Sequence, residues 1–249
     1  MLRSRVSRNA GAQRPFVAEV VPSGATRLEA VSEDATETLD DELIDDDELA
    51  SEAEGPEGLD QEALERRAAA LAQVVKFGDP VLKSPASPVT DFGDELAGEA
   101  DRMIGLMRDA IGVGLAATQL GVLRRMLVFQ VGGEAEPTVL VNPEIEWRSE
   151  DAATAEEGCL SIPGVVVDVE RPLFVRARAV DVRGEPLIVE ASGLEARVIQ
   201  HEVDHLDGVL MLDRTERDQR KGALRALREG GTYAPAQDED EDQEAPTQE

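Results

Sequence analysis

The stretch QHEVDHL at residues 200–206 contains the only two histidines of the chain, His201 and His205. An α-helix repeats about every 3.6 residues, so a spacing of four places both imidazoles on one face, one turn apart. Two neutral imidazoles in this arrangement can share a divalent metal ion, and Glu202 beside the first can act as a general base. The alternative is a solvated helix face that contains histidines by chance. A third ligand is needed to decide between the two interpretations.

Most of the net charge lies in two acidic stretches at the ends of the chain. The 249 residues contain 53 acids against 25 bases, for a net charge of −28. Residues 29–65 contain 17 of these acids and residues 235–249 contain seven, and neither stretch has a base. Blocks of like charge with few aromatic residues bury too little apolar surface to offset the entropy of ordering. We therefore expect a disordered N-terminal extension over residues 1–58 and a disordered tail over residues 231–249.

The composition also argues against several classes of protein. An acidic chain is poorly suited to contact phosphates, so we expect no direct nucleic-acid binding. No stretch approaches about 18 consecutive apolar residues, so we expect no membrane span. A single cysteine rules out an internal disulfide, which fits a reducing cytoplasm. The Arg-rich, acid-free first 18 residues faintly resemble an organelle transit peptide, but 22 Arg against three Lys is more typical of a GC-rich bacterium. We expect a cytoplasmic bacterial protein.

The middle of the chain is predicted to form one domain over residues 73–230, after a lead-in helix at residues 59–72. Asp60 is the expected N-cap of that helix, and apolar residues at spacings of three and four predict a second helix over residues 94–110. Ser192 and Glu195 suggest a capping box at the start of the histidine helix, and a last helix is expected over residues 213–228. Strands are predicted at 74–77, 122–131, 138–147, 165–169, 173–182 and 186–191, the last two as a hairpin.

This order of elements predicts an α+β fold rather than alternating βαβ units. Mostly antiparallel sheets should pack around a central helix that carries the HExxH pattern and binds the metal. One helix on the N-terminal side and one on the C-terminal side should flank them.

The only cysteine, Cys159, lies in the stretch EEGCLSIP at residues 156–163. A lone cysteine is usually a small buried hydrophobe. Here, however, no histidine follows His205, and only Glu216 or Glu229 could reach back from the last helix. Cys159 together with the two histidines makes a three-ligand site with a fourth position open for water, as a catalytic metal requires. Gly158 is expected to let the backbone approach the site closely.

The glycine stretch GVGLAATQ at residues 112–119 loosely matches the dinucleotide fingerprint G-x-G-x-x-A. That fingerprint requires a strand before it and a helix after it. Here a predicted helix precedes it and a predicted strand follows, so we reject a nucleotide site. The stretch is instead predicted to be a glycine loop that ends in the amide of Gln119.

Together, GVGLAATQ, EGCLS and QHEVDHL, in this order and separation, resemble the three signature motifs of bacterial peptide deformylases. The stretches VKFGDPVL at residues 75–82 and LVNP at residues 140–143 are also similar to that family, and the similarity covers about residues 73–228. The IPG sequence after the cysteine motif, without long insertions, resembles the type common in Gram-negative bacteria and organelles.

The resemblance implies a metal-dependent hydrolase that removes the formyl group from the N-terminal methionine of newly synthesised polypeptides and releases formate. It implies one divalent metal ion, Fe(II), which Zn(II), Ni(II) or Co(II) can replace. It also implies a monomer whose partners are N-formyl-methionyl nascent peptides at the ribosome.

Carried over motif by motif, the resemblance implies a role for ten residues. Glu202 is the general acid and base, and Gln119 and the backbone N–H of Leu160 stabilise the oxyanion. Gly114 lines the substrate groove with its backbone. The implied metal ligands are Cys159, His201 and His205, and the implied walls of the methionine pocket are Val113, Leu194 and Val198.

Two other functions remain open from the residues alone. A general HExxH endopeptidase would cleave unformylated peptides and would use a third ligand other than Cys159. A non-catalytic binding module would keep the metal for structure or sensing, and it would need neither Glu202 nor Gln119.

Overall fold

The computed structural model describes residues 58–133 and 135–236, and the predicted disorder of residues 1–57 and 237–249 lies outside this range. All predicted helices are present within one or a few residues of their expected bounds. The elements in chain order are α1 (Gln61–Leu71), η2 (Pro80–Lys83), α2 (Asp94–Asp109), β1 (Gly114–Ala116), η3 (Ala117–Leu120), β2 (Met126–Phe129), β3 (Thr138–Arg148), β4 (Ala152–Gly158), β5 (Val166–Pro172), β6 (Phe174–Val180), β7 (Pro186–Ser192), α3 (Gly193–Leu206), η4 (Met211–Asp213) and α4 (Arg217–Glu229).

The named strands form two sheets in which every pairing is antiparallel. The larger sheet has the order β1-β2-β3-β6-β7, and β4 pairs with β5 in a separate two-stranded sheet. Residues of β6 alternate between buried and more exposed positions, because successive side chains of a strand point to opposite faces. The α+β fold with mostly antiparallel sheets is therefore confirmed.

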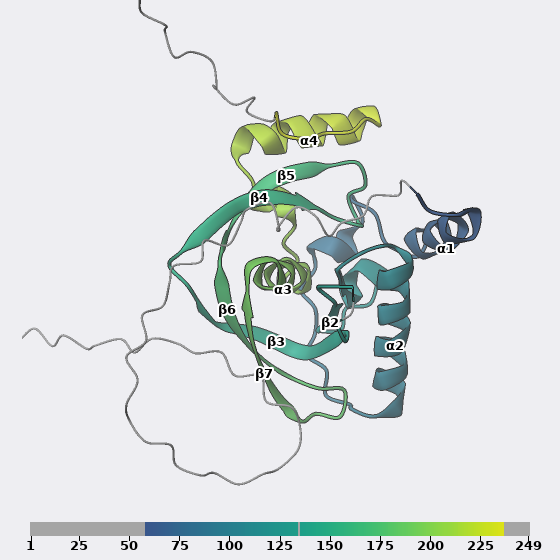
Figure 1. Ribbon diagram of the computed structural model, residues 1–249, viewed down its shortest axis with the longest axis vertical. Coiled ribbons are helices and arrows are strands. Elements are labelled where there is room, and N and C mark those ends of the chain that lie inside the picture. The colour runs from purple at the N-terminus through teal and green to yellow at the C-terminus, as the bar shows by residue number, and fades with distance from the viewer. Residues whose placement is uncertain (1–57, 134, 237–249) are drawn as a thin grey trace, which may run out of the picture. The chain divides into compact units, whose positions relative to one another are not determined.

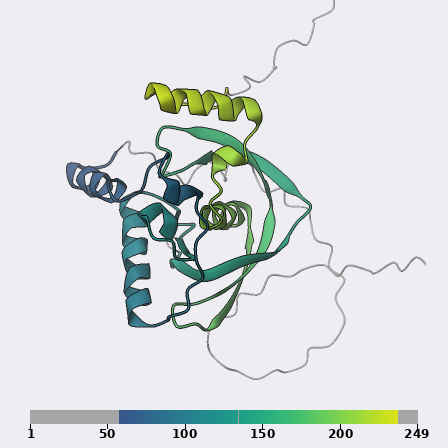
Figure 2. The same ribbon diagram turned by 180° about the vertical axis from the view of Figure 1, so that it is seen from behind.

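Helix α3 lies between the two sheets. Figure 1 shows it end-on, with β4 and β5 on one side, β3, β6 and β7 on the other, and α4 outside β5. The view from behind in Figure 2 shows the same enclosure, with α2 beside the strands. Nine of the 14 residues of α3 are buried, and four of those nine are polar or charged: Gln200, Glu202, Asp204 and His205. Polar side chains in the middle of a domain need partners, so this helix is where a site is expected.

Three apolar clusters hold α3 and its neighbours in place. The predicted stripe of α2 packs against β1 and β2, and its Met103 and Met107 are almost fully buried. The apolar side of α3, including Ile199 and Leu206, packs on the large sheet. Helix α4 and η4 cover β5 through a third cluster. One apolar side of α3 is thus packed on the large sheet, and the elements around the helix have apolar cores of their own.

Two local predictions are wrong. Residues 74–77 are not a strand, because their N–H groups bond to two separate segments: Val75 donates to the carbonyl of Gln119 in η3 at 2.7 Å, and Phe77 donates to that of Ser161 at 2.8 Å. The capping box at the start of α3 is also absent. Ser192 is the N-cap residue, but its side chain makes no capping hydrogen bond.

Other boundaries differ from prediction. The strand expected over residues 122–131 is only Met126–Phe129, and the last helix begins at Arg217 rather than near residue 213. The glycine loop contains the short strand β1, and β4 was not predicted. Residues 231–236 do not begin a disordered tail, since the N–H of Tyr233 donates to Gly164 and its carbonyl accepts from Val166.

None of the helices in the described part of the chain combines the length and the apolar character that a membrane crossing needs.

Candidate active site

The two histidines lie on one face of α3, as their spacing predicts. The ring centroids of His201 and His205 are 5.0 Å apart, with an interplanar angle of 69°. The carbonyl of His205 accepts a hydrogen bond from Thr118 Oγ1 at 3.2 Å, which ties this end of α3 to η3. The two imidazoles are therefore held side by side by the helix and its packing.

Cys159 follows the end of β4 and joins the histidines. Its Sγ lies 3.3 Å from His205 Nε2, and the candidate ligand atoms of Cys159, His201 and His205 are all within 4.8 Å of one another. Burial raises the pKa of the thiol, but the neighbouring histidines overcome that effect and hold it well below its usual value. The sulfur is thus favoured as a thiolate, which is the form that binds metals. One thiolate and two imidazoles fit a divalent transition metal.

Glu157, two residues before Cys159, orients His201. Its Oε2 lies 3.0 Å from His201 Nδ1, which leaves Nε2 of the same ring free to act as a ligand. Burial raises the pKa of Glu157, but hydrogen bonds from Arg171 and His201 outweigh burial and hold it well below its ordinary range. A carboxylate that fixes the second nitrogen of a histidine is a common companion of metal sites.

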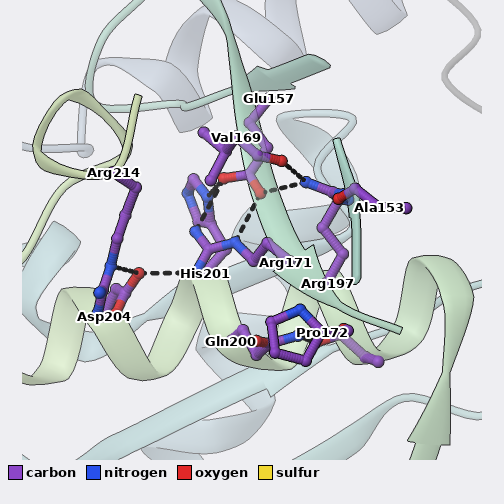
Figure 3. Close-up of polar contacts among 11 residues, drawn as sticks. Ala153, Glu157, Val169, Arg171, Pro172, Arg197, Gln200, His201, Asp204 and Arg214 are labelled. Carbon is purple, nitrogen blue, oxygen red and sulfur yellow. Dashed lines mark hydrogen bonds and ion pairs between the residues drawn. The ribbon is translucent and has the colours of Figure 1, made fainter. Parts of the chain in front are cut away.

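Figure 3 shows that Glu157 belongs to a larger network of buried charges. Arg171 donates two hydrogen bonds to its carboxylate, at 2.7 and 2.9 Å, and Arg197 donates a third at 2.8 Å. The other end of Arg171 bonds to Asp204 at 2.7 Å, and Asp204 also accepts from Arg214 at 2.6 Å. The network joins β4, β5, α3 and the segment after η4, so it fixes the helix against the β4–β5 sheet.

This network was not predicted from the sequence. A signal was present for Glu157, because a metal-ligating histidine usually donates its second ring N–H to a carboxylate or a carbonyl, and Glu157 lies two residues before Cys159. No local signal marked Arg171, Asp204 or Arg214, which come from distant parts of the chain.

Glu202 is the buried acid without a full set of partners. It is 4% exposed, and its Oε2 has no hydrogen-bond partner among the described residues. Burial raises its pKa, with the charges of His201 and His205 opposing that effect. An unpartnered buried carboxylate oxygen is costly unless it serves a purpose, such as handling a proton.

Gly114 on β1 lies against Glu202. A Cβ atom placed on Gly114 would be only 2.5 Å from Glu202 Oε1 and 2.9 Å from both its Cδ and its Cγ. A side chain at position 114 therefore does not fit, and the close approach explains why glycine is needed there. Gly158 is different, because a Cβ there would meet nothing within 4 Å. The expectation that Gly158 allows a close backbone approach is wrong.

Gln119 presents its amide to the cluster. Its Oε1 accepts from the N–H of Ala116 at 2.8 Å, which turns Nε2 toward Cys159 Sγ at 3.7 Å and Ser161 Oγ at 3.4 Å. The side chain of Leu160 comes near Gly112, where a Cβ would be 3.0 Å from Leu160 Cδ1. The glycine stretch and the cysteine stretch thus meet beside the histidines.

The three residues implied as pocket walls have different surroundings. Val113 is 37% exposed, whereas Leu194 and Val198 belong to the apolar cluster between α3 and the large sheet. Two cavities, of about 450 and 180 Å³, lie elsewhere: one is lined by residues 87–96, Leu123 and Arg124, and the other lies between η2 and α4. The chemistry of the side chains, rather than cavity size, identifies the site.

This arrangement combines a three-donor cluster, an unpartnered carboxylate and an amide donor at one buried point. Such a set can hold a metal ion, move a proton and stabilise a developing negative charge, which are the requirements for hydrolysis of an amide.

Comparison with known proteins gives a consistent result. The family model for polypeptide deformylase matches residues 71–221. The peptide deformylase of Acidothermus cellulolyticus is 48% identical over 160 residues, covering 64% of this chain and 87% of the relative, and that of Alkalilimnicola ehrlichii is 47% identical over 160 residues, covering 64% and 89%. A crystal structure of a peptide deformylase from Synechococcus elongatus in complex with actinonin has 43% sequence identity and a TM-score of 0.60, covering 64% of this chain and 88% of that one. The chain belongs to the polypeptide deformylase family.

Proposed function

We propose that the cluster on α3 is the active site with which this hydrolase removes the formyl group from N-terminal methionine. Deformylation of new polypeptides is the activity of the family, and the proposal concerns which residues perform it. The observation that carries it is the buried, unpartnered Oε2 of Glu202 beside three converging ligand atoms.

Cys159, His201 and His205 would hold one divalent metal ion. Thiolate and imidazole donors suit Fe(II) as well as Zn(II), and we propose Fe(II), with Zn(II), Ni(II) or Co(II) as possible replacements. When bound, such an ion lowers the pKa of a coordinated water toward neutrality. Glu157 would keep Nε2 of His201 directed at the ion through its bond to Nδ1.

Glu202 would transfer the proton. Its Oε2 takes a proton from the attacking water and later returns it to the nitrogen of the leaving amine. Burial raises the pKa of Glu202, which makes its carboxylate a stronger base for the first step and favours the protonated form that donates in the second. The backbone of Gly114 leaves just enough room for this carboxylate.

Gln119 and Leu160 would stabilise the charge that develops on the formyl oxygen. The anchored amide of Gln119 directs Nε2 toward the cluster, and the backbone N–H of Leu160 directly follows Cys159. A donor of this kind is typically worth about 10²–10³ in rate.

The substrate would lie along β1. This strand is at the edge of the large sheet and pairs there with β2. Its other edge can therefore accept an extended peptide through backbone hydrogen bonds. Gly114 is on this strand, at the position nearest Glu202. Val113, Leu194 and Val198 would form the walls that receive the methionine side chain.

We further propose that the catalytic unit is residues 73–236, that it acts as a cytoplasmic monomer, and that it meets its substrates as nascent chains at the ribosome. If the acidic extension has no catalytic role, deletion of residues 1–57 leaves kcat/KM for a formyl-methionyl peptide unchanged. A large drop for the shortened protein would contradict this division.

Formate release from a formyl-methionyl peptide by anaerobically purified protein, with elemental analysis of the same sample, tests the proposal. We expect one equivalent of metal per chain and formate release, with no cleavage of the unformylated peptide. Cleavage of internal bonds in unformylated peptides would instead indicate a general endopeptidase.

A further inference from the structure

The segment at residues 75–77 connects the two stretches that supply the proposed oxyanion donors. The N–H of Val75 donates to the carbonyl of Gln119 at 2.7 Å, and that of Phe77 donates to the carbonyl of Ser161 at 2.8 Å. Between them, Lys76 Nζ donates to the carbonyl of Leu160 at 3.1 Å. Three consecutive residues thus bond to η3 on one side and to the cysteine stretch on the other.

The Lys76 contact is a charged hydrogen bond close to the cluster. The ammonium group lies within electrostatic range of Cys159: burial lowers the pKa of Lys76, and the charge of Cys159 opposes that effect. A hydrogen bond from a charged donor is stronger than one between neutral groups. It therefore restrains the carbonyl of Leu160 more firmly than a neutral donor would.

The direct N–H···O contact between the two stretches is long by comparison. Gln119 Nε2 is 3.4 Å from Ser161 Oγ, whereas ordinary N–H···O bonds fall near about 2.9–3.0 Å. The shorter bonds from residues 75–77 therefore do more to set the separation between the main chain at Gln119 and the main chain at Leu160 and Ser161.

We propose that Lys76 is a positioning residue for the oxyanion donors. By holding the carbonyl of Leu160, it fixes the orientation of that residue relative to Gln119, so that the backbone N–H and the side-chain amide point at one place. This role rests on the proposed function, because it presupposes that these two donors serve catalysis. Lys76 touches neither substrate nor metal in this account.

Replacing Lys76 by Met tests the role, since Met keeps most of the apolar stem and removes the donor. Lys76→Arg retains a charged donor, and Lys83→Met is the matched control. Lys83 forms an ion pair with Asp213, and its side chain is 51% exposed. Each variant is prepared as the zinc-loaded full chain and assayed for formate release, metal content, thermal midpoint and hydrogen exchange at the amide of Leu160.

We expect Lys76→Met to lower kcat by about tenfold with little change in KM, because misplacing a catalytic group by a fraction of an ångström affects the transition state more than binding. Its metal content and thermal midpoint should match those of Lys83→Met, while the amide of Leu160 exchanges faster. Lys76→Arg should recover most of kcat.

Two results would overturn the inference. One is a kcat for Lys76→Met within about twofold of the wild type. The other is a loss of kcat that follows a loss of metal or of thermal stability and that Lys76→Arg does not repair. Failure of the proposed function has a different signature, since the wild-type chain itself would then release no formate. The exchange rate at Leu160 would still report whether Lys76 orders this loop.

Discussion

Substitution of Gly114 by Ala adds one atom, Cβ, to the site, and the expected loss of rate can be worked out from the distances around it. The added Cβ would lie 2.5 Å from Glu202 Oε1, and ordinary contact begins at 3.4 Å, so the carboxylate must retreat by about 0.9 Å. Rotation of the carboxylate alone does not relieve the contact, because Cδ and Cγ of Glu202 are also within 2.9 Å. A misplacement near 1 Å costs about 10²-fold in rate, or about 2.7 kcal/mol.

The assay for Gly114→Ala is steady-state formate release from a formyl-methionyl peptide, with metal content measured in parallel. We expect kcat to fall about 10²-fold while metal binding is retained. Gly105→Ala is the control, because a Cβ there meets nothing within 4 Å and Gly105 lies in the interior of α2. The control should keep full activity. A kcat for Gly114→Ala within about threefold of the wild type would refute the proposed role of the Glu202 position.

Three further predictions follow from other parts of the described structure. Ile111→Asn should stabilise the protein by about 1 kcal/mol in urea unfolding, because Ile111 has φ of 57° after the end of α2, where a β-branched residue is strained; an unchanged midpoint would contradict this. Glu157→Gln should cost about 3–5 kcal/mol near neutral pH, since it removes the buried anion of Arg197 and one of the two carboxylates that pair with Arg171. The folded-state pKa of Glu157 is depressed, so its contribution to stability is present above its unfolded value of 4.5 and is lost as the pH falls below it. The difference in unfolding midpoint between the wild type and Glu157→Gln should therefore be large at pH 7 and shrink in acid, and a difference that does not change with pH would argue against this origin. Metal chelation should abolish formate release but leave a cooperative thermal transition, because α3 is held by an apolar core; unfolding upon chelation would indicate a structural metal.

The helices could be predicted from the sequence because their signals are local. The apolar stripe of α2 repeats at the helical period, and Asp60 caps α1 as expected, accepting from the N–H of Ala63. The hairpin of β6 and β7 was equally clear from its alternation and its turn. Strand β4 was not, because its sequence AATAEEG is mostly Ala and Glu and much of it is exposed. Pairing with β5 makes it a strand, and that pairing is a tertiary effect.

The candidate metal ligands could be predicted from the sequence, whereas the residues that hold them in position could not. The chain has one cysteine and two histidines, and the structure brings the ligand atoms of these three residues together. The network of Glu157 and Arg171 depends on strand register, and the contact of Lys76 with Leu160 joins residues 84 positions apart. The strand prediction for residues 74–77 was wrong for a related reason, since apolar character does not reveal which partners the backbone has.

Glu202→Ala tests the central claim most directly. The variant removes the proton carrier and leaves Cys159, His201 and His205 in place on their own elements. Elemental analysis and formate release are measured on the same anaerobic preparation as the wild type. The account predicts one equivalent of metal per chain with formate release reduced by several orders of magnitude. Turnover close to that of the wild type, with the metal retained, would contradict it.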